Sequence, residues 1–192
     1  MGNRLSKIYT RTGDDGTTGM ADGSRVAKDG LRMQAIGEVD ELNSMLGIVI
    51  NKCAAGEVKE NLVTIQHDLF NLGGQLAMPD YEILQASRIE WLEQMLDVMN
   101  AELTPLKEFI LPGGAESASY CHLARAICRR AERALVSLSR EESTKPELAA
   151  YINRLSDWLF VASRYLNKQQ GEQEVYWQSG RIAAYDKQQS SD

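Results

Sequence analysis

Apolar residues that recur every three or four positions dominate the chain from Leu31 onward and constrain its fold most strongly. In the range 57–77 they alternate in steps of four and three, which places them on one face of an α-helix. The same spacing predicts helices over about 31–52, 57–77, 86–103, 115–140 and 146–169. Helices joined by short loops pack antiparallel to their neighbours. We therefore expect an all-α fold, an antiparallel five-helix bundle.

The ends of the helices carry their own signals. Ser87 is a residue type that caps helix N-termini, and Pro146 is suited to the first turn of a helix because that turn does not use its missing N–H. No internal repeat or linker divides the chain. We expect a single domain over 1–192, with an N-terminal loop at about 8–30, the bundle at about 31–170 and a polar tail at about 180–192.

Composition excludes several classes of protein. The formal net charge is -6, whereas proteins that bind nucleic acid usually carry a net basic face. Neither a signal peptide nor a run of about 18 apolar residues is present, so we expect a cytoplasmic protein with no membrane partner. The three cysteines form no CxxC pair, which favours reduced thiols. The two histidines provide no HExxH motif for zinc.

The predicted fourth helix has an unusual charge distribution. Residues 117–140 include five arginines, no lysine and one acid, Glu132, in a chain with more acidic than basic residues. Helical spacing places Arg125, Arg129 and Glu132 on one stripe, beside a row of small residues that would let a neighbouring helix approach. Solvated arginines paired with Glu132 are the ordinary interpretation. The planar guanidinium also binds phosphate or carboxylate in a bidentate manner, so the alternative is a polyanion site.

Two further segments extend this hypothesis. Asp40, on the first predicted helix, is a candidate counter-charge for one of the arginines. The segment Tyr9–Gly19, "YTRTGDDGTTG", contains two glycines three residues apart among hydroxyl side chains, whose N–H and O–H groups suit a phosphate. It is not a Walker loop, since no Gly-Lys-Ser/Thr follows, and a simple Asp-Gly turn is the alternative.

Taken together, five segments occur in an order that is specific to one family. They are "YTRTGDDGTT", "GEVDELNSMLG", "FILPGG", "RAICRRAER" and "INRLSDWLF". The chain resembles the PduO-type ATP:cob(I)alamin adenosyltransferases over nearly its whole length. The resemblance implies a homotrimer with an active site at each subunit interface. It also implies transfer of the 5′-deoxyadenosyl group of ATP to the cobalt of cob(I)alamin, which yields adenosylcobalamin and triphosphate.

The resemblance also assigns roles to individual residues. ATP, with Mg²⁺, would bind the N-terminal loop, the fourth helix and one residue of the fifth. These residues are Thr10, Arg11, Thr12, Gly13, Thr17, Thr18, Lys28, Arg129, Arg130, Glu132, Arg133 and Asn153. Glu132 would hold Mg²⁺ through water or position an arginine, rather than act as a base. Asp40 would pair with Arg125 across the interface, and Arg129 would stabilise the departing triphosphate.

Phe109 would crowd the lower face of cobalamin and keep its dimethylbenzimidazole off the cobalt. Without the resemblance, core packing is the ordinary interpretation of this phenylalanine. A flavoprotein reductase and a cobalamin-dependent acceptor enzyme are the implied protein partners. Three other functions are compatible with parts of the sequence: a binding module for nucleotide or corrinoid, a phosphoryl-transfer enzyme, and a purely structural bundle. The last explains neither the glycine loop nor the segregated arginines.

Overall fold

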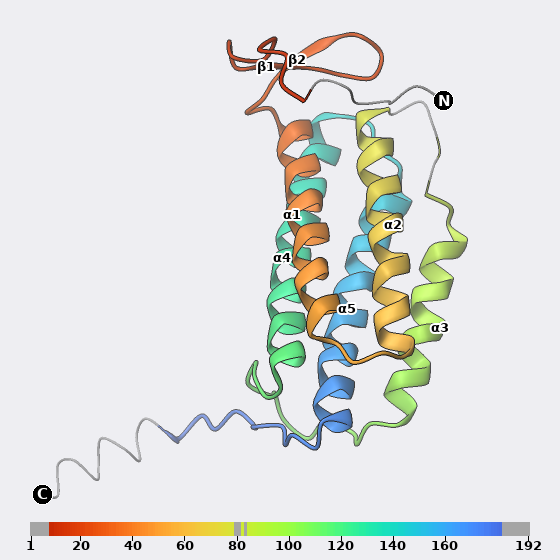
Figure 1. Ribbon diagram of the computed structural model, residues 1–192, viewed down its shortest axis with the longest axis vertical. Coiled ribbons are helices and arrows are strands. Elements are labelled where there is room, and N and C mark those ends of the chain that lie inside the picture. The colour runs from red at the N-terminus through yellow and green to blue at the C-terminus, as the bar shows by residue number, and fades with distance from the viewer. Residues whose placement is uncertain (1–7, 79–81, 83, 182–192) are drawn as a thin grey trace, which may run out of the picture.

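The computed structural model describes residues 8–78, 82 and 84–181, and these residues form five helices in an antiparallel bundle (Figure 1). The bounds of the helices are α1 Leu31–Lys52, α2 Glu57–Ala77, α3 Ser87–Ala101, α4 Glu116–Glu141 and α5 Pro146–Gln169. The all-α five-helix prediction is confirmed, and every predicted boundary lies within two residues of the observed one. Residues 182–192, most of the expected polar tail, lie outside the described residues.

The core runs along the line where α4 packs between α1 and α5. The small residues of α4 are fully buried there: Ala118, Cys121, Ala124, Cys128 and Ala131. The Sγ–H groups of Cys121 and Cys128 donate to the carbonyls of Leu159 and Ile152 on α5, both at 3.2 Å. The prediction that this row admits a close neighbour is therefore confirmed. Burial raises the pKa of both thiols, and all three cysteines of the chain are free.

The start of α3 differs from the prediction. Ser87 is the first helical residue, and the N-cap position belongs to Ala86, which has no side-chain cap. Ala86 already has right-handed helical dihedrals, φ -56° and ψ -32°, whereas a serine cap requires an extended conformation. Pro146 does begin α5, as predicted.

A small antiparallel hairpin, which the sequence pattern does not predict, precedes the bundle. Its strands are β1 Thr17–Gly19 and β2 Arg25–Ala27, with Thr18 opposite Val26. Three residues are too few to show an alternating pattern in the sequence. The hairpin lies at the end of the bundle where α1 begins, and the connection from α3 to α4 lies at the other end (Figure 1).

A buried charged network fastens α2 to α3 and α5. The carboxylate of Asp68 on α2 accepts hydrogen bonds from Arg88 at 2.8 and 2.9 Å and from the hydroxyl of Tyr151 at 2.9 Å. The Arg88 guanidinium also stacks on the ring of Trp91, 4.1 Å from its centroid. Every one of these groups has a partner, so we interpret the network as structural.

Candidate functional site

The N-terminal loop is folded tightly around Gly13, which lies close to Thr17 and Lys28. Gly16 N–H donates to Gly13 O, which closes the turn that the sequence analysis gave as the ordinary interpretation. A Cβ on Gly13 would lie 2.9 Å from the Thr17 carbonyl and 3.0 Å from Lys28 Nζ, so only glycine fits. Arg11 has a positive φ of 62°, a strained conformation for a residue with a side chain.

Two cationic side chains in the second half of this loop, Lys28 and Arg25, donate hydrogen bonds to residues of its first half. Lys28 Nζ donates to Gly13 O at 2.7 Å, which places the predicted lysine beside the predicted glycine. Arg25 Nε donates to Thr17 Oγ1 at 2.9 Å, and its Nη2 donates to the Thr12 carbonyl. Arg25 was not among the predicted residues. Its role depends on the register of the hairpin, which brings it next to β1, and no local sequence signal reveals that.

Side chains of α4, the helix rich in arginine, line a surface cleft of about 400 Å³. Arg129, Glu132, Arg133, Val136, Ser137 and Arg140 line it, and all six are on α4. Asn153 on α5 donates a 2.8 Å hydrogen bond to Glu132 Oε1. The structure therefore brings together four residues that the resemblance assigned to ATP, namely Arg129, Glu132, Arg133 and Asn153.

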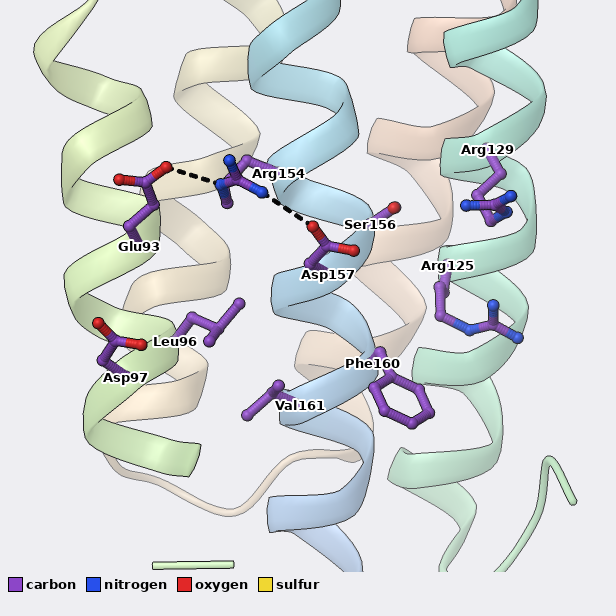
Figure 2. Close-up of a pocket in the computed structure, with 10 residues that line it drawn as sticks. All are labelled: Glu93, Leu96, Asp97, Arg125, Arg129, Arg154, Ser156, Asp157, Phe160 and Val161. Atoms are coloured by element: carbon purple, nitrogen blue, oxygen red, sulfur yellow. Dashed lines mark hydrogen bonds and ion pairs between the residues drawn. The ribbon is translucent and has the colours of Figure 1, made fainter. Parts of the chain in front are cut away.

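A second cleft of about 550 Å³ adjoins the first and shares Arg129 with it. Figure 2 shows the residues that line it, among them Arg125 and Arg129 on α4 and Asp157 and Phe160 on α5. Its lining also includes acidic and cationic residues of α3 and α5, among them Arg154, which pairs with Asp157 at 3.0 Å. Arg125 Nε is buried and has no hydrogen-bond partner among the described residues.

Arg130 does not line the cleft that its sequence neighbours Arg129 and Arg133 line. Its guanidinium turns toward α1, where Nε pairs with Glu38 at 2.5 Å and Nη2 pairs with Glu41. These two hydrogen-bonded carboxylates raise the pKa of Arg130 above its already high value. In this structure the guanidinium is therefore used to fasten α4 to α1.

Asp40 lies in an apolar groove of about 340 Å³ between α1 and α2, and the described residues that line the groove include no arginine. The groove walls include Met33, Ile36 and Phe70, and Phe70 is among the most exposed large apolar side chains of the molecule. No ion pair is recorded for Asp40 within the described chain. Asp40 and Arg125 are thus exposed or half-buried charges of opposite sign on different faces of one bundle.

Phe109 lies in the connection between α3 and α4, and its side chain is 77% exposed. The ordinary interpretation of this residue as part of the core is therefore wrong. The neighbouring backbone pairs with a late segment of the chain, since Ile110 forms an antiparallel bridge with Tyr176. This connection lies at the end of the bundle opposite the N-terminal hairpin (Figure 1).

Within one chain, the predicted site is therefore divided into separate parts. In the described part of the chain, no hydrogen bond or ion pair joins residues 10–30 to the arginines of α4. The residues that the structure describes include no group of three His, Cys, Asp or Glu side chains that is suited to a metal ion. None of the described helices is long and apolar enough to cross a membrane.

The comparisons with known proteins identify the family. Residues 8–166 match the sequence profile of the family described as cobalamin adenosyltransferase. The chain belongs to the cobalamin adenosyltransferase family. A cobalamin adenosyltransferase of Cupriavidus metallidurans is 53% identical over 94% of this chain and 99% of its own length. The corrinoid adenosyltransferase of Bacillus subtilis is 41% identical over 96% of this chain and 98% of its own.

Solved structures of this adenosyltransferase family have the same fold. One is a PduO-type ATP:corrinoid adenosyltransferase variant from Lactobacillus reuteri complexed with cobalamin and ATP. It is 36% identical, has a TM-score of 0.86, and the match covers 90% of this chain and all of that one. Another variant of that enzyme, complexed with ATP, is 38% identical with a TM-score of 0.84, and covers 89% of this chain. The resemblance drawn from the sequence is confirmed.

Proposed function

We propose that this protein is an ATP:cob(I)alamin adenosyltransferase that acts as a single domain. It transfers the 5′-deoxyadenosyl group of ATP to the cobalt of cob(I)alamin and releases triphosphate. Membership of the adenosyltransferase family over residues 8–166 is the observation that carries this conclusion. The arginine cleft on α4 and the glycine loop supply the cations and donors that a triphosphate requires.

ATP binds between the N-terminal loop and the cleft of α4. Thr10, Arg11, Thr12, Gly13, Thr17, Thr18 and Lys28 contribute from the loop, while Arg129, Glu132, Arg133 and Asn153 contribute from the helices. Arg130 acts indirectly in this proposal, because its guanidinium is paired with Glu38 and Glu41 on α1. These ion pairs hold α4 against α1 and so fix the helix that carries the neighbouring arginines.

The working enzyme is a homotrimer in which one copy completes the site of the next. Two observations support this. Among the described residues, no direct bond joins the loop to the arginine cleft, and neither Asp40 nor Arg125, charges on different faces, has an ion-pair partner. An Asp40–Arg125 pair between neighbouring subunits supplies the missing counter-charges and lets the apolar groove around Phe70 be covered.

The chemistry requires alignment and charge rather than proton transfer. Cob(I)alamin is the nucleophile: its cobalt forms a bond to the 5′ carbon of ATP as the carbon–oxygen bond to the triphosphate breaks. Negative charge grows on the departing triphosphate. Arg129, Lys28 and Arg11 therefore stabilise the transition state more than they stabilise bound ATP, which is the condition for catalysis.

Glu132 is the residue that would hold Mg²⁺ through water. The donor set fits this ion, because Mg²⁺ in nucleotide sites binds one or two carboxylates together with phosphate oxygens and keeps several waters. Glu132 lies among arginines that face the same cleft, and one of its oxygens is oriented by the amide of Asn153. Bound Mg²⁺ supplies additional positive charge on the leaving group.

Phe109 acts on the corrinoid before the transfer. Its exposed ring displaces the dimethylbenzimidazole from cob(II)alamin and leaves a four-coordinate cobalt, which accepts an electron more readily. A flavoprotein reductase supplies that electron in the cytoplasm, and a cobalamin-dependent enzyme receives the product. The exposure of Phe109, with no role in the core, supports this assignment.

One anaerobic assay tests the activity. The protein is mixed with ATP, Mg²⁺ and chemically reduced cobalamin, and the cobalt–carbon product is followed by absorbance while the phosphate products are identified. We expect adenosylcobalamin and triphosphate in equal amounts. Release of ADP or inorganic phosphate would identify a phosphoryl-transfer enzyme instead, and ligand binding without a spectral change would identify a binding module.

A further inference from the structure

The connection that carries Phe109 has very little packing of its own. Residues 104–111, here called the Phe109 loop, include no buried residue. Exposed segments without buried apolar contacts open locally at low free-energy cost unless other bonds hold them. The position of Phe109 therefore depends on the few hydrogen bonds that the loop makes with other segments.

The two bonds that flank Phe109 come from one short piece of chain after α5. Residues 172–177, here called the strap, run antiparallel to the Phe109 loop. Trp177 N–H donates to the Phe109 carbonyl and Leu111 N–H donates to the Val175 carbonyl, both at 2.8 Å. The strap side chains at 175–177 are themselves exposed, so apolar packing does not hold the strap either.

A buried ion pair fastens both segments to α5. Arg164 is only 4% exposed, and its guanidinium binds the Glu174 carboxylate of the strap at 2.6 and 3.1 Å. The same guanidinium donates to the Thr104 carbonyl, where the Phe109 loop begins, at 2.8 Å. One buried cation thus holds the start of the loop and the middle of the strap.

Asn167, one turn further along α5, repeats this arrangement just beyond the C-terminal end of the Phe109 loop. Its side chain accepts from Ala115 N–H and donates to the Gly113 carbonyl, and its own carbonyl accepts from the N–H of Glu172 in the strap. Gly114, between Gly113 and Ala115, has a φ of +94°, and a Cβ there would lie 2.2 Å from Asn167 Oδ1. Arg164 and Asn167 therefore bracket both segments.

We propose that the Arg164–Glu174 ion pair is a positioning device for Phe109, which acts by holding the strap against the Phe109 loop. Neither residue touches the reacting atoms. Loss of the Glu174 charge leaves Arg164 buried without a neutralising partner, and detachment of the strap is the easiest way to admit water to it. The Phe109 backbone then loses its bond to Trp177. This inference rests on the role proposed above for Phe109.

The experiment compares Glu174→Gln with Glu102→Gln. Glu102 also pairs with a cation of α5, Lys168, at 3.0 Å, but this pair is about half exposed and does not bind the strap. The first readout needs no ligand: amide hydrogen exchange at Trp177 and Leu111. We expect Glu174→Gln to speed this exchange by about tenfold or more, and Glu102→Gln to leave it within about twofold of wild type. Unchanged exchange in Glu174→Gln would overturn the proposal.

The second readout is the coordination of the substrate. With cob(II)alamin and ATP, electron paramagnetic resonance gives the four-coordinate fraction, which we expect to fall by about tenfold in Glu174→Gln. Turnover of chemically reduced cob(I)alamin, which has no lower ligand to displace, stays within about twofold of wild type. In a Phe109→Ala background, Glu174→Gln adds no further loss, because the ion pair acts only through Phe109. Additive losses would contradict this.

A second pair of variants covers the case in which Glu174→Gln does not fold. Trp177→Pro removes the N–H that holds Phe109 and leaves the ion pair intact, whereas Trp177→Ala removes the side chain and keeps that N–H. We expect a larger loss of four-coordinate cobalt in the proline variant, and equal losses would count against the strap. If wild type forms no adenosylcobalamin, the proposed function fails. If wild type is active and the strap variants behave like it, only the positioning role fails.

Discussion

Asn153 on α5 and Glu132 on α4 are joined by a 2.8 Å hydrogen bond between their side chains. The bond orients one carboxylate oxygen of Glu132, whose side chain lines the same cleft as Arg129, and within the described residues the other oxygen has no hydrogen bond. Both residues belong to the proposed ATP site, and the bond fixes them relative to one another before any ligand arrives. A preorganised carboxylate of this kind suits a hydrated metal ion on a nucleotide.

Glu132→Gln separates the charge of this residue from its hydrogen bond. The glutamine keeps an oxygen for Asn153, so we expect the free energy of unfolding to change by less than about 1 kcal/mol. Loss of the negative charge weakens the hold on Mg²⁺, so the concentration of Mg²⁺ for half-maximal turnover should rise by about tenfold. A titration of activity with Mg²⁺ measures this, and an unchanged midpoint would remove Glu132 from the metal site.

Arg129 and Arg130 are adjacent in the sequence, but we expect substitution of the first to reduce activity and substitution of the second to reduce stability. Arg129→Ala should reduce turnover by about a thousandfold or more with little change in stability, because its guanidinium faces the cleft. Arg130→Ala should lower the free energy of unfolding by about 1 kcal/mol, because it breaks partly exposed pairs with Glu38 and Glu41. Steady-state kinetics and urea unfolding on both variants distinguish these outcomes. Near wild-type turnover of Arg129→Ala would end its assigned role.

The Asp40–Arg125 contact between subunits is tested by exchanging the charges. Asp40→Arg and Arg125→Asp each place like charges together at the proposed interface, and each should shift the protein from trimer to monomer at micromolar concentration. The double variant restores opposite charges and should recover most of the trimer. Sedimentation velocity reports the assembly state, and a wild-type protein that sediments as a monomer would refute the interface itself.

The Asp68 network makes a prediction about stability alone. Asp68→Ala leaves Arg88 without its counter-charge and Tyr151 without its acceptor, so it should cost about 3–5 kcal/mol of unfolding free energy. Tyr151→Phe removes only one hydrogen bond and should cost about 1 kcal/mol. Urea denaturation measures both. Equal losses in the two variants would show that the ion pair contributes nothing beyond the hydroxyl.

His122 makes the fold sensitive to acid. Burial, helped by the nearby Arg125 and opposed by Glu174, lowers the pKa of this imidazole from 6.5 to about 4. Between these values the unfolded chain binds a proton that the folded protein does not, so stability falls as the pH decreases from 6.5 toward 4. The loss approaches about 3 kcal/mol and is absent above pH 6.5. His122→Leu should flatten this part of the profile of urea midpoint against pH, and parallel profiles would contradict the assignment.

The helices, and the choice of candidate site residues, follow from local sequence because their signals are local. The spacing of apolar residues sets which face of each helix is buried. The small side chains in the row from Ala118 to Ala131 predict close packing of a neighbouring helix, and this row is buried. The family motifs likewise name Arg129, Asn153 and Phe109 without any coordinates. The apolar spacing depends on residues within a few turns of one another, and each family motif is a short continuous segment, although the resemblance needs all five in order.

The remaining features depend on residues that are distant along the chain. The sequence places Arg129 and Arg130 side by side, but only the packing of α4 against α1 gives Glu38 and Glu41 to one of them and leaves the other facing the cleft. Arg25 reaches Thr12 and Thr17 only because the hairpin turns it back. Glu174 meets Arg164, and Trp177 meets Phe109, because the chain folds back after α5. The sequence by itself determined five helices and their chemistry, while the tertiary structure decided which charges are satisfied internally and which are left for a ligand or a neighbouring subunit, since pairing depends on distance in space.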